Sequence, residues 1–359
     1  MNTSLKLLLL IACLCGLNFT SAQQTRNVIW ITYDGLRWQE VFQGIDSSLM
    51  VNETYTNQTA KLRNKFWDPD PGKRRQKLLP FFWEVIAGEG QLYGNRMHGN
   101  LVNVTNDQWF SYPGYNEILT GRADSSIQSN AKVWNKNTTL LEFANGQKGF
   151  RGKVAAFGSW DVFPYIINEA RSGLPVNAGF EEAFWPRLSK RARFLNELQR
   201  QTPSPWTSVR LDVFTHHYAK EYLRRHRPRL LYIAYGETDD FAHDGDYDAY
   251  IEAAHRTDAF IRDLWNFVQS HPAYRNKTSL VISTDHGRGT LPVDHWRSHG
   301  TKIKGSDEIW IAILGPDSPA LGELTSPGQL YQNQLAQTVA RLLGLPYTVG
   351  GKWIETAFK

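Results

Sequence analysis

Six acidic and histidine side chains in this sequence lie near the ends of apolar runs of strand length, five of them shortly after a run and His299 before the last one. In chain order they are Asp34, Asp239, His243, Asp285, His286 and His299. Mixed carboxylate and imidazole ligands suit Zn²⁺, and six such groups are enough for two ions with three protein ligands each. Two neighbouring ions can stabilise both the attacking and the leaving oxygen of a phosphoryl transfer. These residue types therefore predict a metal-dependent reaction at phosphorus.

The elements that would position these side chains alternate between strands and helices. Buried strands are expected at 27–33, 153–157, 230–235, 279–284 and 308–314, because these runs are apolar on both faces. Helical patterns occupy 79–87, 247–270 and 329–343. The alternation predicts an α/β fold with a mainly parallel sheet. Such sheets bind ligands beyond the carboxyl ends of their strands, which is where the six side chains would meet.

The co-occurrence of these residues carries more weight than any one of them. A single Asp-Gly after a strand is usually a turn, and a single histidine is usually structural. The remaining histidines do not follow a strand and are interpreted as structural. His295 is the alternative to His299, because both lie in the segment 294–300.

A nucleophile is expected at Ser111. The segment 111–115, with the sequence SYPGY, precedes a helical stretch that Gly121 closes. At the start of a helix, free N–H groups and the helix dipole favour the negative charge of a phosphorylated serine. An ordinary N-cap serine is the alternative.

The order of these motifs resembles the alkaline phosphatase superfamily, and within it the type I phosphodiesterase/nucleotide pyrophosphatase branch. The resemblance rests on Asp-Gly after the first strand, Ser-x-Pro with Thr-Gly nine residues on, Asp-x3-His, Asp-His-Gly and His-Gly, between residues 27 and about 316. It implies a three-layer sandwich with a mainly parallel central sheet and helices on both faces. One Zn²⁺ would be held beside Ser111, as nucleophile and ligand, by Asp34, Asp285 and His286. The other would be held by Asp239, His243 and His299.

The chain departs from this branch near the motifs. The branch usually has Thr followed by Phe-Pro-Asn where this chain has Ser111 followed by Tyr-Pro-Gly, and it commonly has Met at the position of Arg288. In the branch, an Asn downstream of the nucleophile binds a phosphate oxygen. Asn130 is the best match here, with Asn135 as the alternative. Arg288 is expected to reach a substrate phosphate or else to face solvent.

The expected activity is hydrolysis of phosphoric esters with two Zn²⁺ and a phosphoserine intermediate. Monoesterases of this fold carry a cationic Lys-x-Arg in a region where this chain has residues 159–164, SWDVFP. Trp160 and Phe163 would form walls there for an organic group, which favours diesters of the nucleotide type or other organic diesters. A phosphomonoesterase is the alternative. A sulfatase is less favoured, because Tyr115 stands where its motif needs Arg, and an inactive binding protein is disfavoured by the complete set of ligands.

The first 22 residues are expected to be a cleaved secretory signal peptide. Lys6 is followed by an apolar run and then by small residues before Gln23, and the run is too short to span a bilayer. Lipoprotein anchoring at Cys13 is the alternative. Cleavage before Gln23 would remove Cys13 and Cys15, which leaves no disulfide and no thiolate ligand. The protein is therefore expected to be secreted or periplasmic, without a transmembrane segment.

Composition and charge bound the remaining questions. The chain has 359 residues, of which 41% are hydrophobic and 21% charged, so it is not a disordered chain, a coiled coil or a polytopic membrane protein. Without the leader's one Lys, 39 basic side chains face 35 acidic ones, and a net charge of +4 does not indicate nucleic-acid binding. Residues 23–359 are expected to form one catalytic domain with polar, irregular edge insertions near 46–78 and 159–228. The expected partner is a small-molecule phosphate ester, and the oligomeric state stays open.

Overall fold

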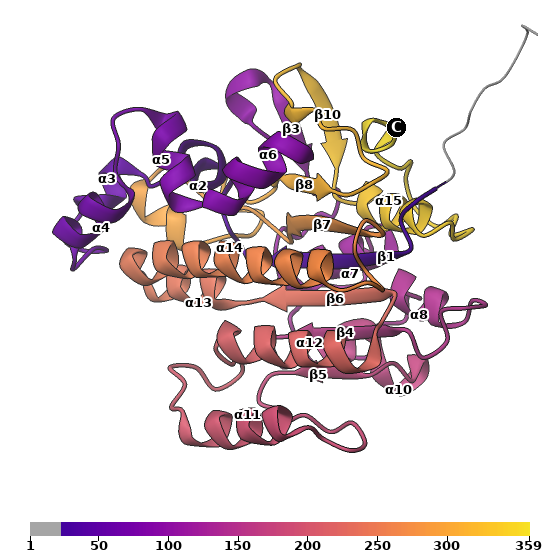
Figure 1. Cartoon of the computed structure of the whole chain (residues 1–359). Coiled ribbons are helices and arrows are strands. Elements are labelled where there is room, and N and C mark those ends of the chain that lie inside the picture. Colours follow the sequence, from indigo (N-terminus) through magenta and orange to yellow (C-terminus); the bar gives the residue numbers. More distant parts are fainter. Residues whose placement is uncertain (1–22) are drawn as a thin grey trace, which may run out of the picture.

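A central sheet of eight strands organises the protein (Figure 1). The computed structural model describes residues 23–359, so the predicted signal peptide and Cys13 lie outside the described residues. The strands follow the order β5-β4-β6-β1-β7-β8-β2-β9, and all of them run parallel except β8, which is antiparallel to β7 and β2. Their bounds are β1 Asn27–Tyr33, β2 Gln91–Tyr93, β4 Val154–Gly158, β5 Val176–Ala178, β6 Leu230–Tyr235, β7 Thr278–Thr284, β8 Ile311–Leu314 and β9 Gly322–Glu323. A separate two-stranded sheet pairs β3 (Asn100–Asn103) with β10 (Gly328–Tyr331).

Helices cover both faces of the large sheet. One hydrophobic core lies under α2 (Trp38–Gln43), α3 (Ser47–Met50), α4 (Thr59–Phe66), α5 (Pro71–Leu78), α11 (Lys190–Gln201), α12 (Asp212–His226), α13 (Glu237–Asp244) and α14 (Tyr247–Ser270). The second core lies under α7 (Ser111–Thr120), α8 (Leu140–Asn145), α9 (Phe163–Ile167) and α15 (Gln334–Leu342). The shorter helices are α6 (Ala87–Glu89) and α10 (Glu169–Ser172), and a π-helical turn spans Phe82–Ile86. The three-layer sandwich predicted from the sequence is confirmed.

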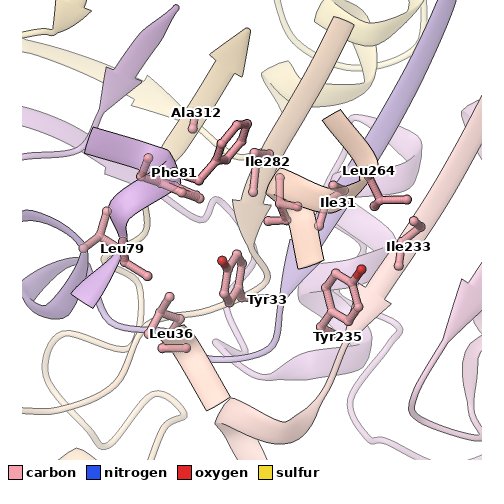
Figure 2. Packing of buried hydrophobic residues seen from close by; sticks show 14 of the residues in the cluster. Ile31, Tyr33, Leu36, Leu79, Phe81, Ile233, Tyr235, Leu264, Ile282 and Ala312 are labelled. Atoms are coloured by element: carbon pink, nitrogen blue, oxygen red, sulfur yellow. The ribbon is translucent and has the colours of Figure 1, made fainter. Parts of the chain in front are cut away.

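The central strand β1 divides its side chains between the two cores. Ile31 and Tyr33 point to the side of α14, where they meet Ile233 of β6, Ile282 of β7 and Leu264 of α14 (Figure 2). Val28 and Trp30 lie in the second core. Every residue of β1 is buried, because a central parallel strand is covered on both faces and so needs apolar residues at successive positions.

The predicted strands agree with the structure, except that β8 begins three residues later than expected. The helix expected at 329–343 begins only at Gln334, because its first residues belong to β10. Two segments expected to be irregular contain helices. Segment 46–78 folds into α3, α4 and α5, and segment 159–228 contains α11 and α12 as well as the edge strand β5. The prediction of irregular structure was wrong because charged side chains interrupt the apolar residues of these segments, as in α5, where only Leu78 is buried. Helix α12, by contrast, buries Phe214, Tyr218 and Leu223. Helix α5 has Asp70 as its N-cap and Pro71 as its first residue, and this pair is a recognisable signal for the start of a helix. In the described part of the chain, no helix combines the length and apolarity needed to cross a bilayer.

Candidate functional site

The carboxyl ends of β6, β1 and β7 bring the predicted ligands together. These strands are neighbours in the middle of the sheet, with Asp34 directly after β1, Asp285 and His286 directly after β7, and α13 shortly after β6. The six side chains form two groups, and within each group the ligand atoms lie within 4.8 Å of one another. We call Asp34, Asp285 and His286 the first triad, and Asp239, His243 and His299 the second triad. The structure thus groups these residues as the resemblance implied.

The first triad is buried and lacks a compensating charge. Nε2 of His286 lies 3.4 Å from Oδ1 of Asp34 and 3.5 Å from Oδ2 of Asp285. Those two carboxylate oxygens are buried without a hydrogen-bond partner. Burial, followed by the repulsion of neighbouring carboxylates, raises the pKa of Asp34 and of Asp285 well above the ordinary value. An arrangement of this kind favours a bound cation, because the cation would replace the lost solvation of both groups.

Hydrogen bonds on the far side orient each ligand of the first triad. The Tyr115 hydroxyl donates to Oδ2 of Asp34 at 2.8 Å, and the Gly35 amide donates to Oδ1 of Asp285 at 3.0 Å. Nδ1 of His286 lies 2.9 Å from the Gly287 carbonyl. Because a carbonyl only accepts, Nδ1 carries the proton and the lone pair of Nε2 faces the carboxylates. The Tyr115 contact was not predictable from local sequence, because it joins residues 81 positions apart.

The second triad is more open. On α13, His243 follows Asp239 by one helical turn, and its Nε2 lies 3.2 Å from Oδ2 of Asp239. The same nitrogen lies 3.0 Å from Nε2 of His299. The His243 side chain is 45% exposed. Burial lowers the pKa of His299 well below its ordinary value, which favours the neutral imidazole that a metal requires. His295, the alternative from the sequence, is not part of this group.

Ser111 lies beside the first triad at the start of α7. Its side chain is buried, and Oγ lies 3.5 Å from Nε2 of His286. The sequence interpretation placed a serine at the helix cap, but Phe110 is the N-cap and Ser111 is the first helical residue. The N-cap side chain caps no N–H group at this helix start, and the amide of Tyr112 is instead bonded by Oδ1 of Asn130. The hydroxyl therefore stands next to both the ligand group and the positive end of the helix dipole.

The two asparagines weighed as phosphate ligands have different environments. Asn130 is exposed, and its Oδ1 accepts a hydrogen bond of 3.0 Å from the amide of Tyr112, the neighbour of Ser111. Asn135 is buried and donates to Asn116 and to the Ile166 carbonyl. Asn135 therefore supports the loop, whereas Asn130 lies at the helix start where a phosphate would bind.

The aromatic residues after β4 face different surroundings. Phe163 is buried against Tyr115, with ring centroids 4.7 Å apart, so its predicted role as an open wall was wrong. Trp160 is half-buried and meets Phe163 edge-on at 6.4 Å. The role of Trp160 toward substrate stays a prediction.

Arg288 lies inside the site and does not face solvent. Its side chain is 1% exposed. The guanidinium donates to the carboxylate and the carbonyl of Asp239, to the Gly35 carbonyl and to the Arg297 carbonyl. Four of the five N–H donors of the guanidinium therefore have protein acceptors, and one remains for a substrate oxygen.

Asp212 is a supporting residue that the sequence analysis did not identify. This first residue of α12 accepts hydrogen bonds from the amides of Gly236 and Glu237, at 2.8 and 3.2 Å, where α13 begins. Burial, together with the charge of Glu237, raises the pKa of Asp212 to about 7. The contact fixes the start of the helix that carries Asp239. This role was not predictable from the acidic residues after β6, because the carboxylate that accepts these hydrogen bonds belongs to α12, which precedes β6 in the chain.

Comparisons with known proteins agree with this geometry. The alkaline phosphatase PafA has a similar fold, with a TM-score of 0.63 and 11% identity over 93% of this chain and 99% of that one. Human ectonucleotide pyrophosphatase/phosphodiesterase 5 gives 0.55 and 12% over 91% and 97%, and the lipoteichoic acid synthase LtaP from Listeria monocytogenes gives 0.56 and 13% over 94% and 76%. No curated protein sequence matches the chain significantly. The profile of the type I phosphodiesterase/nucleotide pyrophosphatase family matches residues 45–305. The chain therefore belongs to this family of alkaline phosphatase superfamily enzymes.

Proposed function

We propose that the protein is a secreted hydrolase of phosphoric esters, with two Zn²⁺, a phosphoserine intermediate and a preference for diesters. The observation that carries this proposal is the position of the Ser111 hydroxyl, 3.5 Å from the ligand nitrogen of His286 and in the first residue of α7. A nucleophile beside a metal-ligand group is the arrangement that covalent phosphoryl transfer needs.

The residues of both triads suit zinc. Two orphaned carboxylate oxygens and a lone pair on His286 converge in the first triad, and the second triad offers one carboxylate and two imidazoles. Oxygen and imidazole nitrogen are the donors that Zn²⁺ takes in hydrolytic sites. Bound zinc would lower the pKa of the serine hydroxyl and stabilise negative charge on the phosphoryl and leaving oxygens.

The side chains near Ser111 have assignable roles in the reaction. Oγ of Ser111 attacks phosphorus in line, the new Ser–O–P bond forms, and the ester bond to the leaving alkoxide breaks. Water then hydrolyses the phosphoserine, which returns the hydroxyl and releases the phosphate product. In the first turn of α7 the Tyr112 amide bonds Asn130, Pro113 has no N–H and the Gly114 amide bonds the Phe110 carbonyl, so the Ser111 amide would bind an equatorial oxygen. Because Oδ1 of Asn130 accepts from the Tyr112 amide, its NH₂ group is left to donate to the same phosphate.

The preference for diesters rests on charge. A monoester dianion needs more positive charge than a diester monoanion, and the region of Ser159–Pro164 brings none. Arg288 offers one free N–H, which fits one oxygen of a diester. Trp160 would contact the organic group. A phosphomonoesterase is the second candidate.

The rates of hydrolysis of three model esters, measured under the same conditions, distinguish a diesterase from a monoesterase and a sulfatase. Bis(p-nitrophenyl) phosphate, p-nitrophenyl phosphate and p-nitrophenyl sulfate should be compared with one zinc-loaded preparation. We expect the highest kcat/KM for the diester and no sulfatase activity above background. A higher value for the monoester would establish the phosphomonoesterase. A higher value for the sulfate, with calcium in the protein, would contradict the phosphoesterase.

Export is tested at the N-terminus of the processed protein. Cleavage of a signal peptide after Ala22 predicts a mature chain that begins at Gln23. A lipid-modified chain beginning at Cys13 would instead show anchoring. We further propose that residues 23–359 form a single catalytic domain, with 46–78 and 159–228 as insertions at its edges.

A further inference from the structure

Arg288 connects segments that carry ligands of both triads. Its guanidinium donates to Asp239, and its Nε donates to the Gly35 carbonyl at 3.1 Å, at the end of β1. Nη1 donates to the Arg297 carbonyl at 2.7 Å, in the loop that carries His299. A Cβ at Gly35 would lie 2.8 Å from Nε, so only glycine lets the guanidinium approach this close. The position of Arg288 is therefore built into the site.

The two triads differ in charge because of this contact. In the described structure, neither Asp34 nor Asp285 pairs with an arginine or a lysine, so both carboxylates of the first triad lack the direct ion pair that Asp239 has. The second triad holds one carboxylate, Asp239, which already pairs with Arg288. The first triad is also buried, whereas the second is partly open to water. A cation therefore relieves repulsion in the first triad but meets a positive charge in the second.

We infer that Arg288 makes the two metal sites unequal, so that the first triad fills first and the second triad binds its cation more weakly, in competition with the guanidinium. This inference rests on the proposed function and deepens it. A cation at the second triad must take an oxygen of Asp239 that the guanidinium holds. Removing the arginine should bring the two affinities closer together.

The test is a Zn²⁺ titration of the metal-free full chain in a competing chelator. We expect two steps in the wild type, with dissociation constants at least about tenfold apart, the size of effect that groups bonded to metal ligands usually have. Asp34→Asn should remove the tight step, and His243→Ala should remove the weak one. Arg288→Met should strengthen the weak step at least about tenfold and leave the tight step nearly unchanged.

Two further variants separate charge from packing. Arg288→Lys keeps the positive charge and should keep the two steps apart. Arg210→Met removes another buried arginine, which bonds to Asn177 and Thr215, and should leave both steps as in the wild type. Two equal steps in the wild type or in Arg288→Lys would overturn the inference, as would an unchanged separation in Arg288→Met. If Arg288→Met fails to fold, the wild type and Arg288→Lys still decide.

The titration measures binding without turnover. Two equal steps in a protein that hydrolyses diesters would overturn this inference alone. Unequal steps in a protein that hydrolyses none of the three p-nitrophenyl esters would leave the inference standing and contradict the proposed function.

Discussion

Each ligand residue of the first triad has its orientation set by a second residue. Tyr115 holds one oxygen of Asp34, the Gly35 amide holds one oxygen of Asp285, and a carbonyl fixes the tautomer of His286. The remaining oxygen or nitrogen of each ligand is left facing its neighbours. Such fixed ligands reduce the entropy that a metal must overcome on binding.

Ser111→Ala should lower turnover of bis(p-nitrophenyl) phosphate by more than about a thousandfold, which corresponds to about 4 kcal/mol of transition-state stabilisation. Metal content and fold should persist, because Ser111 is the first helical residue and caps nothing. Ser189→Ala is the control, since Ser189 does cap α11 and should cost about 1 kcal/mol of stability without loss of turnover. Activity within tenfold of the wild type in Ser111→Ala would place the nucleophile elsewhere.

His299→Ala should lose zinc and activity together, because the second triad would fall to two ligands. His295→Ala should keep both within a few-fold. Elemental analysis of the purified variants after gel filtration gives the metal content. Loss of metal in His295→Ala, with full metal in His299→Ala, would reverse the assignment of the second triad.

At the scale of elements, α7 has to lie tightly against the end of β7. A Cβ at Gly114 would overlap the carbonyl oxygen of Asp285. The Asn that the related branch has after its proline could not fit here with this backbone. The departure from the family pattern at Gly114 is therefore a consequence of how close the nucleophile helix approaches the first triad.

Gly114→Ala should push α7 away from β7, which lowers both zinc affinity and kcat, although alanine is the better helix former. Gly88→Ala is the matched control, since nothing lies within 4 Å of its Cβ position, and it should be neutral or stabilising. Zinc titration and thermal unfolding of both variants measure the effect. Wild-type values in Gly114→Ala would show that the helix has room to adjust.

Asp258 of α14 holds the chain where the π-helical turn begins. Its carboxylate accepts from the amides of Phe81 and Phe82, at 2.8 and 3.1 Å, and burial raises its pKa to about 7. The unfolded chain ionises near pH 4. The stability that protonated Asp258 contributes is therefore complete below about pH 4 and is lost as the pH rises through 7.

The free energy of unfolding of the metal-free wild type, relative to Asp258→Asn, should thus fall between about pH 4.5 and pH 7.5. Asp46→Asn is the control. Burial opposes a low pKa at Asp46, but hydrogen bonds from Ser48 and the charge of Arg37 outweigh it and lower the pKa. The difference in unfolding free energy between the wild type and Asp46→Asn should therefore not change with pH over this range. Denaturant unfolding at both pH values provides the comparison. A flat difference for Asp258→Asn would contradict the assignment.

How far the sequence predicts the structure depends on the kind of element. The long apolar runs predicted β1 and β6 at their observed bounds and β4 and β7 within one residue. A strand buried on both faces is apolar at successive positions, and this pattern is easily recognised in a sequence. Edge strands such as β5 have three residues, too few for a pattern. The grouping of the ligands was predictable from motif order. The partners Tyr115, Asp212 and Arg288 were not, since only the packed fold brings their side chains to the ligands.

At the scale of the whole molecule, metal removal should destabilise the protein. A chelator leaves the two carboxylates of the first triad buried and uncompensated. Zinc at about a thousandfold over its dissociation constant would stabilise one site by about 4 kcal/mol. We expect the midpoint of thermal unfolding to drop by several degrees with chelator and to return with zinc. No change in the midpoint, with metal shown to leave, would mean that the triads are stable when empty.

The place of β1 in the sheet has a consequence for the order of folding. Thr32 of β1 contacts Tyr232 of β6, 200 residues later in the chain, and the Gly35 amide contacts Asp285, 250 residues later. The entropy of closing such long loops is lost before these contacts form, which makes them late events. Neither triad can be complete before residues 286 and 299, respectively, have been synthesised. Metal bound at both triads would therefore stabilise a fold that is already largely formed, rather than guide the early steps of folding.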